Sequence, residues 1–339
     1  MIPPVMLLSE ADVERHLDLA ACIAAVDDAF TRLGHGQTHA PTLSHLHAPP
    51  GEVHIKAGGV GGEDGLLTVK IGSGFFDNPA HGLPSINSVL VALSATTGMP
   101  RAIMGARTLT RRRTAAGTAV AARALSRPGP ARVLIIGSGA QGADHVRALN
   151  HVLAVEQFSL WSRSADRAET LAKALELEGY PVRVAGALAT EIPAGTHIVT
   201  LTPATSPFED LTEVADNAVI LAVGADSPHK RELPLELMRR AQVVVDLVDQ
   251  CSRVGELHHA LAEGAIISVD DIIEIGTLLT RKAPMRSTEG PVVYDATGTA
   301  VQDVAAASVV LRAITREQDQ PSFDFAARQH SASVARPAR

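Results

Sequence analysis

Two cationic residues in the first third of the chain stand where a charged side chain needs a partner. Lys70 lies between two apolar residues, and a lysine in such a setting must be paired or must point at an anion. Arg113 ends a basic run and, with Thr114, opens a predicted helix, which is a good place to hold a carboxylate. We therefore expect Lys70 and Arg113 to bind an anion, and the two arginines before Arg113 to be solvated.

A candidate acid or base follows the predicted strand over residues 218–223. Asp226 stands at the carboxyl end of that strand, and ligands bind outside the carboxyl ends of strands in open α/β sheets. It could serve as a general acid or base if partial burial raised its pKa. Taken alone, Asp226 fits a helix cap better than a catalyst, so the residues leave both roles open.

A glycine-rich turn lies between a predicted strand over residues 133–136 and an amphipathic helix. Gly137, Gly139 and Gly142 form the pattern Gly-x-Gly-x-x-Gly. In a dinucleotide-binding turn the first glycine makes the turn, the second lets the backbone approach a pyrophosphate, and the third lets the helix pack close to the strand. A strand, this turn and a helix in that order favour dinucleotide binding over a tight turn in another α/β fold.

The residues after the second predicted strand indicate which dinucleotide binds. An acidic residue there selects NAD, and a cation accommodates the 2′-phosphate of NADP. The sequence is Trp161-Ser162-Arg163-Ser164, in which Arg163 can pair with a phosphate and the serines can donate hydrogen bonds. We expect NADP(H) to be favoured, with NAD(H) as the alternative.

The histidines of the first half raise the question of a metal site. His45 and His47 alternate on one face of a predicted strand, with His35, His39 and His54 nearby. Zinc sites that combine histidines with a carboxylate need an Asp or Glu at ligand spacing, and none stands at a convincing spacing here. We therefore expect scattered surface histidines and no metal. The sequence also contains neither a Gly-x-Ser-x-Gly elbow nor a Walker lysine loop.

Composition and charge exclude several classes of partner. The chain has 339 residues, a formal net charge of −7 and only 3% aromatic residues, so we expect it to bind no nucleic acid. Its 2 cysteines give neither a disulfide framework nor a thiolate metal site. With no signal-peptide core and no apolar run of membrane-spanning length, we expect a cytoplasmic protein without a membrane partner.

The elements that must position these residues begin with a mixed pattern. Ser9 and Asp12 resemble a capping box at the start of a short helix, and an apolar stripe over residues 19–33 predicts a second helix. Short β-like runs follow between residues 40 and 106. Among them, the glycine-rich stretch over residues 58–65 is more typical of a hairpin tip than of a mobile lid. These runs predict a β-rich α+β domain that binds the substrate.

Beyond a boundary at residues 127–130 the pattern changes to alternating strands and helices. This alternation predicts an α/β fold with a doubly wound parallel (Rossmann) sheet and right-handed crossovers. We expect residues 292–294 and a helix over residues 300–314 to return to the first domain. The predicted regions are therefore a substrate-binding domain over residues 1–126 with 292–316, a NAD(P)-binding domain over residues 127–291, and a disordered tail over residues 317–339.

Several motifs occur together and in a fixed order. They are Gly82-Leu83-Pro84-Ser85, residues 109–116, the glycine turn at residues 137–142, Val223-Gly224-Ala225-Asp226 with Lys230 and Glu232-Leu233, and Gly298 with Gln302-Asp303. On these motifs the sequence resembles the ornithine cyclodeaminase/μ-crystallin family from about residue 7 to residue 311. Several motifs in the same order are more specific than one glycine turn.

This resemblance implies a homodimer, in which the β-rich domain binds substrate and forms the dimer while a Rossmann domain binds NAD(P). By matching positions, Asp226 would be the catalytic acid/base, and Arg113 and Lys70 would bind the substrate carboxylate, with Lys70 close to the reacting atoms. Other residues implied to line the site are Ser85, Thr114, Lys230 and Gly298. The implied cofactor-binding residues are Gly137, Gly139, Ala140, Gln141, Gly142, Arg163, Ser164, Thr114, Thr202, Val223 and Lys230.

Departures from the family pattern bear on the substrate. A glutamate that the cyclodeaminases use falls at His54, and Lys56 adds a further cation. Within the family, the chain is similar to the ectoine-utilisation and iminosuccinate-reductase branch. His54 and Lys56 in place of a site carboxylate suit a substrate with a second acidic group better than the ammonium tail of ornithine.

The resemblance also implies an activity at the α-carbon of a small amino or imino acid. We expect an NAD(P)H-dependent imino-acid (ketimine) reductase, reversible as an amino-acid dehydrogenase, for a substrate such as iminosuccinate. Arg113 and Lys70 would clamp the α-carboxylate, Asp226 would manage the proton on the nitrogen, and Lys56 would hold a side-chain carboxylate. Two alternatives stay open: an ornithine cyclodeaminase with NAD⁺ as a transient oxidant, and a non-catalytic NADP-dependent binder of small molecules.

Overall fold

A computed structural model of the chain describes residues 4–75, 77–280, 290–314 and 321–324. The first part of the chain contains helices and antiparallel strands, and the capping box predicted for Ser9 and Asp12 is confirmed at the start of the first helix. The elements of this part are β1 Val5–Leu8, α1 Glu10–His16, α2 Leu19–Gly34, β2 Thr38–Ala48, β3 Gly51–Val60, β4 Leu66–Gly74, η1 Asn78–His81, β5 Ile86–Ser94, β6 Pro100–Gly105 and α3 Arg107–Leu125.

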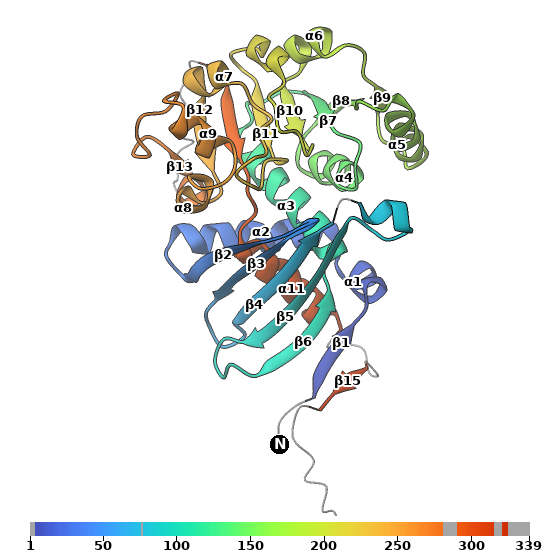
Figure 1. The fold of residues 1–339 in the computed structure, drawn as a ribbon, viewed down its shortest axis with the longest axis vertical. Helices are drawn as coiled ribbons and strands as arrows, with labels where there is room; N and C mark the ends of the chain where they lie inside the picture. The colour runs from blue at the N-terminus through green and yellow to red at the C-terminus, as the bar shows by residue number, and fades with distance from the viewer. Residues whose placement is uncertain (1–3, 76, 281–289, 315–320, 325–339) are drawn as a thin grey trace, which may run out of the picture.

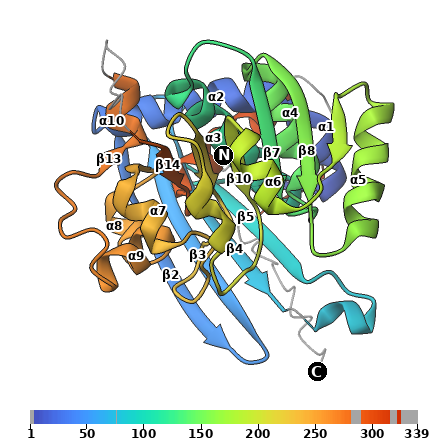
Figure 2. The ribbon, with the colours of Figure 1, turned by 90° about the horizontal axis from the view of Figure 1, so that it is seen from above.

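A seven-stranded sheet in the order β15-β1-β6-β5-β4-β3-β2 is built largely from these strands. Its neighbouring strands are antiparallel except for β1 and β6. Helices α2 and α11 (Ala300–Ile314) lie on one face of this sheet, and none of the helices in the described ranges lies on the other (Figure 1 and Figure 2). The predicted β-rich half is confirmed, and the glycine-rich stretch forms the hairpin tip between β3 and β4.

The second part of the chain alternates strands with helices, as predicted. Its elements are β7 Ala131–Ile136, α4 Gly142–Val152, β8 Val155–Trp161, α5 Ala165–Leu177, β9 Val182–Val184, α6 Leu188–Glu191, η2 Ile192–Ala194, β10 His197–Thr200, η3 Glu209–Glu213, β11 Val219–Ala222, α7 Leu235–Arg240, β12 Gln242–Val245, α8 Val248–Cys251, α9 Glu256–Ala262, β13 Ile273–Glu274, α10 Ile275–Thr280 and β14 Val292–Asp295.

These strands form an eight-stranded parallel sheet in the order β13-β12-β14-β11-β10-β7-β8-β9. The run β9-β8-β7-β10-β11 has the order of a doubly wound Rossmann sheet, with its switch point between β7 and β10. The expectation that residues 292–294 return to the first domain is wrong. Val292 pairs with Val219 of β11 and with Gln242 of β12, because a buried apolar run fits the centre of a parallel sheet.

Helix α3 joins the two sheets and begins earlier than the predicted start at residue 114. The Glu10 carboxylate accepts hydrogen bonds from the backbone N–H groups of Arg107 (2.8 Å) and Thr108 (3.1 Å). A side chain from α1 thus satisfies the first amides of α3, and no local residue signals this start. Consequently Arg113 lies inside the helix, and the prediction that it stands at a helix N-terminus is wrong.

The end of the chain is described only in part. Residues 317–320 and 325–339, for which we predict disorder, lie outside the described residues. Within the predicted tail, Ser322–Phe323 instead form strand β15, which pairs with β1 at the sheet edge. Over the described ranges, no helix combines the length and the apolar character that crossing a membrane requires.

Candidate active site

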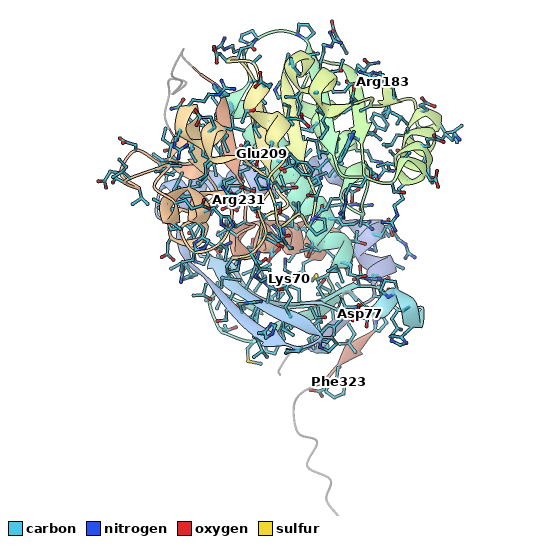
Figure 3. The ribbon with its side chains drawn as sticks, turned by 45° about the horizontal axis from the view of Figure 1, so that its top comes forward. Lys70, Asp77, Arg183, Glu209, Arg231 and Phe323 are labelled. Carbon is cyan, nitrogen blue, oxygen red and sulfur yellow. The ribbon has the colours of Figure 1, made fainter. Side chains whose placement is uncertain are left out.

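Lys70 and Arg113 meet at one buried carboxylate. Lys70 Nζ donates to Asp303 Oδ1 at 2.8 Å, and Arg113 Nε lies 3.0 Å from the same oxygen. Arg113 Nη1 also donates to Gln302 Oε1 at 2.9 Å. Lys70 comes from β4, Arg113 from α3 and Asp303 from the first turn of α11, and Figure 3 shows Lys70 on the side of the sheet that faces α11. The structure therefore brings together the two cations that the sequence singled out.

A third cation, Lys56 of β3, is the direct cross-strand partner of Lys70 of β4. Its Nζ donates to the backbone carbonyls of Thr297 (2.9 Å) and Gly298 (2.7 Å). A lysine ammonium has three protons, so one remains for a ligand. Lys56 is therefore less available to a substrate carboxylate than predicted, because it also holds the turn between β14 and α11.

Gly298 needs to be a glycine for two reasons. Its φ is +77°, and a Cβ at this position would lie 2.4 Å from Arg113 Nη1. Its N–H donates to Asp246 Oδ2 at 2.6 Å. Gly298 thus contacts the cation cluster through its backbone, and its implied contact with a substrate stays a prediction.

The three cations of this cluster are buried, so their charges are poorly solvated by water. Lys56, Lys70 and Arg113 are 7%, 5% and 4% exposed, and Asp303 forms ion pairs with Lys70 and Arg113. Burial, together with Arg113, lowers the pKa of Lys70 to about 7, although Asp303 works in the opposite direction. Burial likewise lowers the pKa of Lys56. Buried Asp246 also acts on Lys56, but the three cations still outnumber Asp303 and Asp246. An excess of buried positive charge is costly unless an anion joins it, so the cluster is suited to bind a carboxylate.

Asp226 follows β11 and pairs with Lys230, whose Nζ lies 2.5 Å from Asp226 Oδ1. Its side chain is 46% exposed. Burial opposes ionisation, but Lys230 and Lys56 outweigh it and lower the pKa of Asp226 to about 2. The condition set for Asp226 as a general acid or base, a pKa raised by burial, is therefore not met in this structure. Because Asp226 acts on the pKa values of Lys56 and His54, it lies within electrostatic reach of both.

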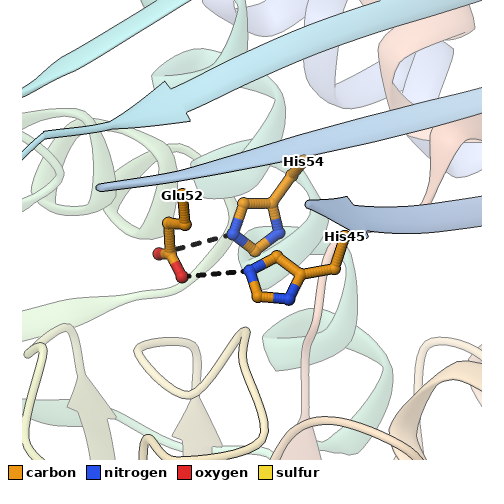
Figure 4. Close-up of side chains that lie close together, drawn as sticks. All are labelled: His45, Glu52 and His54. Atoms are coloured by element: carbon orange, nitrogen blue, oxygen red, sulfur yellow. Dashed lines mark hydrogen bonds and ion pairs between the residues drawn. The ribbon is translucent and has the colours of Figure 1, made fainter. Parts of the chain in front are cut away.

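His45 and His54 converge on Glu52. The prediction that the histidines are scattered is therefore wrong for this pair. His45 Nε2 lies 3.2 Å from Glu52 Oε2, and His54 Nε2 lies 3.4 Å from Glu52 Oε1. The two ring centroids are 4.6 Å apart, and Figure 4 shows both rings turned toward the carboxylate. Burial raises the pKa of Glu52, but His54 and His45 more than offset it, so the pKa is lowered.

The glycine turn after β7 has the shape that a pyrophosphate needs. Gly137 has a φ of +127°, and a Cβ there would lie 2.8 Å from the Leu201 carbonyl oxygen. A Cβ on Gly139 would meet nothing within 4 Å, so space is open beside its backbone. A Cβ on Gly142 would lie 2.7 Å from Leu171 Cδ2, so this glycine lets α4 pack close to α5. The sequence analysis expected it to let the helix pack close to the strand. The turn thus fits a dinucleotide phosphate at the start of α4.

A cavity of about 680 Å³ borders this turn. Its lining includes Gly137, Gly139, Trp161 and Thr202. The predicted Arg163 and Ser164 line it as well, together with Arg167, which sequence reasoning missed although it follows Arg163 by one helical turn. The residues present therefore fit a dinucleotide, and two cations stand where a 2′-phosphate would lie.

The remaining predicted residues are placed with less direct evidence. Gln141 has a buried Oε1 that accepts no hydrogen bond within the described residues, next to an exposed Ala140. The Thr114 hydroxyl donates to the Thr110 carbonyl of its own helix. Ser85 lies in the loop before β5, where its carbonyl accepts a hydrogen bond from the Phe75 N–H. Cofactor or substrate contacts of these residues stay predictions.

Buried Glu232 belongs to one of the family motifs, but the sequence analysis gave it no role in the site. Its carboxylate accepts hydrogen bonds from the Thr202 N–H (2.7 Å) and the Gly224 N–H (2.9 Å). Glu232 thereby joins the loops that follow β10 and β11 and positions Thr202 beside the cavity. Val223, which follows β11 directly, donates its N–H to the Thr200 carbonyl. Burial raises the pKa of Glu232, which favours the neutral carboxyl.

The sequence contained an indication that Asp303 would be a buried anion beside the cations. Asp303 and Gln302 stand in the first turn of a helix that is otherwise apolar, and both are buried. A carboxylate in such a helix needs a cationic partner. The sequence analysis used the two residues only as part of a motif and did not place them in the site. The contact of Glu52 with His45 was harder to predict, because only the pairing of β2 with β3 brings the two residues together.

The fold and the site together define a class of protein. A Rossmann-type parallel sheet carries a dinucleotide-shaped turn and cavity, and an antiparallel sheet beside it carries buried cations suited to a small carboxylate. This combination describes a two-sheet α/β protein with a nicotinamide-dinucleotide site beside a cluster of buried cations. The chain belongs to the ornithine cyclodeaminase/mu-crystallin family, whose sequence profile matches residues 4–318.

Relatives in this family carry different activities. The alanine dehydrogenase of Archaeoglobus fulgidus is 30% identical over 307 residues, which cover 90% of this chain and 94% of that protein. The iminosuccinate reductase of Paracoccus denitrificans is 28% identical, covering 91% of this chain and 96% of the relative. The L-lysine cyclodeaminase of Streptomyces rapamycinicus is 28% identical, covering 90% and 91%.

Solved structures are similar over almost the whole chain. An archaeal alanine dehydrogenase dimer with bound NAD superposes with a TM-score of 0.88 at 28% identity, covering 95% of this chain and 100% of that chain. The Paracoccus denitrificans iminosuccinate reductase in complex with NAD⁺ gives a TM-score of 0.87 at 25% identity, also covering 95% and 100%. The α/β fold with a Rossmann sheet and a separate antiparallel sheet is therefore that of the family.

Proposed function

We propose that this chain is an NAD(P)H-dependent reductase of a small 2-imino acid and runs in reverse as an amino-acid dehydrogenase. The observation that carries the proposal is the buried group of Lys56, Lys70 and Arg113, in which Asp303 is the carboxylate bonded to Lys70 and Arg113. A substrate carboxylate would supply the missing negative charge. The family relatives that act on alanine and iminosuccinate support this class of substrate.

Each of these residues has its own proposed role in the reaction. Arg113 and Lys70 bind the α-carboxylate and so orient the imine carbon C2. The turn at Gly137 and the cavity beside it would hold a reduced nicotinamide dinucleotide, which would supply the hydride for the new C–H bond at C2. Asp226, a carboxylate at neutral pH, would hold the protonated imine nitrogen. It would also relay one proton between solvent and that nitrogen, to the neutral amine in the forward direction and from the ammonium group in the reverse direction.

Two features favour a substrate with a second acidic group, such as iminosuccinate. Lys56 retains one free proton beside the cluster, and His54 lies within electrostatic reach of Asp226. The similarity to an iminosuccinate reductase points the same way. We further propose NADP(H) as the favoured cofactor, because Arg163 and Arg167 line the cavity and no acidic residue follows β8 directly.

The protein is also proposed to act as a homodimer in the cytoplasm. The sheet face opposite α2 and α11 carries exposed apolar side chains, and the similar archaeal alanine dehydrogenase is a dimer. Both cysteines, Cys22 and Cys251, are buried and free, as a reducing compartment would keep them.

Deaminating cyclisation is the second candidate function. It is favoured by Glu52, whose carboxylate lies beside His54 and could hold a second ammonium group, and by the similarity to an L-lysine cyclodeaminase. This reaction returns its hydride to the intermediate, so it releases ammonia without net consumption of NAD(P)H.

The deciding experiment follows oxidation of NADPH and NADH by the purified protein. Oxaloacetate, pyruvate or glyoxylate is supplied with ammonium or methylamine, and each oxo acid is also tested without amine. Amine-dependent oxidation that is fastest with oxaloacetate is expected. If no pair consumes either cofactor while ornithine or lysine releases ammonia, the reductase proposal is wrong and the cyclodeaminase is correct.

Asp226→Asn tests the assignment of roles within that assay. We expect kcat to fall by about 100-fold or more with cofactor binding unchanged, since general acid–base groups contribute about 10²–10⁴-fold. Asp210→Asn, an exposed aspartate of the same half, is the control and should keep the wild-type rate. A wild-type rate in Asp226→Asn would remove Asp226 from the mechanism.

A further inference from the structure

Three side chains outside the carboxylate-binding cluster form a group with the composition of a metal site. His45, Glu52 and His54 each offer a ligand atom, and these atoms lie within 4.8 Å of one another. Both histidines use Nε2, and each approaches a different oxygen of the same carboxylate (Figure 4). Two histidines and one glutamate are a ligand set found in catalytic zinc sites, which keep a fourth position open.

The two histidine-to-carboxylate distances are close to those between ligands of one ion. Ligand atoms that lie about 2.0–2.2 Å from a tetrahedral zinc are roughly 3.3–3.6 Å apart. The two Nε2 to oxygen separations are 3.2 Å for His45 and 3.4 Å for His54. An ion could therefore replace the two hydrogen bonds with small rotations of the side chains, without a change in the backbone.

The backbone that carries the group is rigid. His45 of β2 and His54 of β3 are direct cross-strand partners, and Glu52 follows two positions from His54, so that all three side chains point to one face. His47 of β2 shares this face but is exposed and takes no part in the group. The pairing of β2 with β3 thus sets the arrangement before any ligand arrives.

We propose that His45, Glu52 and His54 bind a divalent transition-metal ion of the zinc class, with a coordination position left open to solvent or ligand. Imidazole and carboxylate ligands suit Zn²⁺ and its neighbours rather than Mg²⁺ or Ca²⁺, which take oxygen ligands. The site lies within electrostatic reach of Asp226 and Lys230, so a bound ion would add positive charge beside the proposed substrate site. The proposal shares His54 and Glu52 with the substrate sites discussed above, but its test measures metal binding alone and does not depend on the reaction catalysed.

The test uses untagged full-length protein that has been treated with a chelator and then dialysed. Zn²⁺ alone is titrated in by calorimetry, and metal content after gel filtration is measured by mass spectrometry. We expect one Zn²⁺ per chain and a raised Tm, because an ion that binds only the folded state stabilises it. Co²⁺ should bind the same site and show the visible absorption of a tetrahedral nitrogen–oxygen complex.

Variants then locate the ion. His45→Ala and Glu52→Gln should each weaken Zn²⁺ binding by at least tenfold, with circular dichroism showing that both variants fold. His47→Ala, on the same strand face, and His258→Ala, in the other histidine pair, should bind as the wild type does. Absence of stoichiometric binding, or equal losses in the control variants, would overturn the proposal.

Discussion

At the scale of the residue, the site is governed by charges that are held out of water. Lys70 and Arg113 share the Asp303 carboxylate, and Lys56 is held by two carbonyl oxygens. Burial raises the pKa of Asp303, but Lys70 and Arg113 more than offset it, so the pKa is lowered and this group stays ionised. Lys70 is different, because burial brings its pKa to about 7 and its charge then depends on pH in the ordinary range.

Carboxylate binding should therefore weaken as pH rises through about 7. A lysine whose pKa is lowered carries its charge only below that pKa, so the ammonium that attracts the ligand is lost on the alkaline side. We expect the Kd of succinate, which does not react, to rise by up to about tenfold per pH unit between pH 7 and 9. Isothermal titration calorimetry measures this directly.

Lys70→Arg is the matched control for this pH dependence, because a guanidinium stays protonated throughout the range. The variant should bind succinate with a nearly flat pH profile, even if its affinity is lower. A slope equal to that of the wild type would show that another group titrates.

Arg163 should decide cofactor preference at the same scale. Removing a charge-assisted contact of about 1.5–3 kcal/mol corresponds to about 10- to 100-fold in affinity. Arg163→Ala should therefore bind NADPH about 10- to 100-fold more weakly and leave NADH binding nearly unchanged, as followed by nicotinamide fluorescence. Arg239→Ala, a surface arginine of the same half, serves as the control. Equal losses for both cofactors would contradict a 2′-phosphate contact.

At the scale of the element, the turn between β14 and α11 links the two sheets. Its carbonyls accept the Lys56 ammonium, and the Gly298 N–H donates to Asp246 at the end of β12. The turn thus ties a strand of the antiparallel sheet to the parallel sheet. It also sets where α11 starts, and so where Asp303 meets Arg113.

Gly298→Ala should damage this turn and the site together. The left-handed φ of +77° disfavours alanine, and its Cβ would displace Arg113, 2.4 Å away. We expect a lower Tm and succinate binding weakened by tenfold or more. Gly264→Ala has a similar φ of +68° but nothing within 4 Å of its Cβ, so it should lower the Tm while succinate binding stays normal. Similar binding in the two variants would show that the Arg113 contact is unimportant.

At the scale of the whole molecule, the uncovered face of the seven-stranded sheet is the feature that needs explanation. Ile55, Ile71 and Val89 form a cross-strand row on this face and are 37%, 41% and 37% exposed. Leu46 and Leu7 extend the exposed apolar surface, at 59% and 39%. Contiguous apolar surface of this kind marks an interaction site, and a second copy of the chain is the proposed partner.

Charges on this row should therefore separate the dimer. Sedimentation of the wild type is expected to give the mass of a dimer, and Ile55→Asp with Ile71→Asp is expected to give a folded monomer. Leu177→Asp, which changes an isolated apolar residue of α5 that is 90% exposed, should leave the dimer intact. A double variant that stays dimeric would place the interface elsewhere.

The sequence by itself determined the features that depend on local spacing. Apolar runs, the glycine turn at Gly137 and the Ser9 capping box were predicted because each is written within a few neighbouring residues. Lys70 and Arg113 were singled out in the same way, since a buried cation needs an anion whatever the fold. The family motifs then linked these pieces in order.

Only the tertiary structure decided which distant groups meet. Lys70 and Asp303 are 233 positions apart, Glu10 caps α3 from another helix, and Glu52 reaches His45 through strand pairing. The direction of the Asp226 pKa shift is also a tertiary property, since Lys56 and Lys230 outweigh burial only once the fold places them there. Contacts of this kind depend on strand register and packing, which local patterns do not encode.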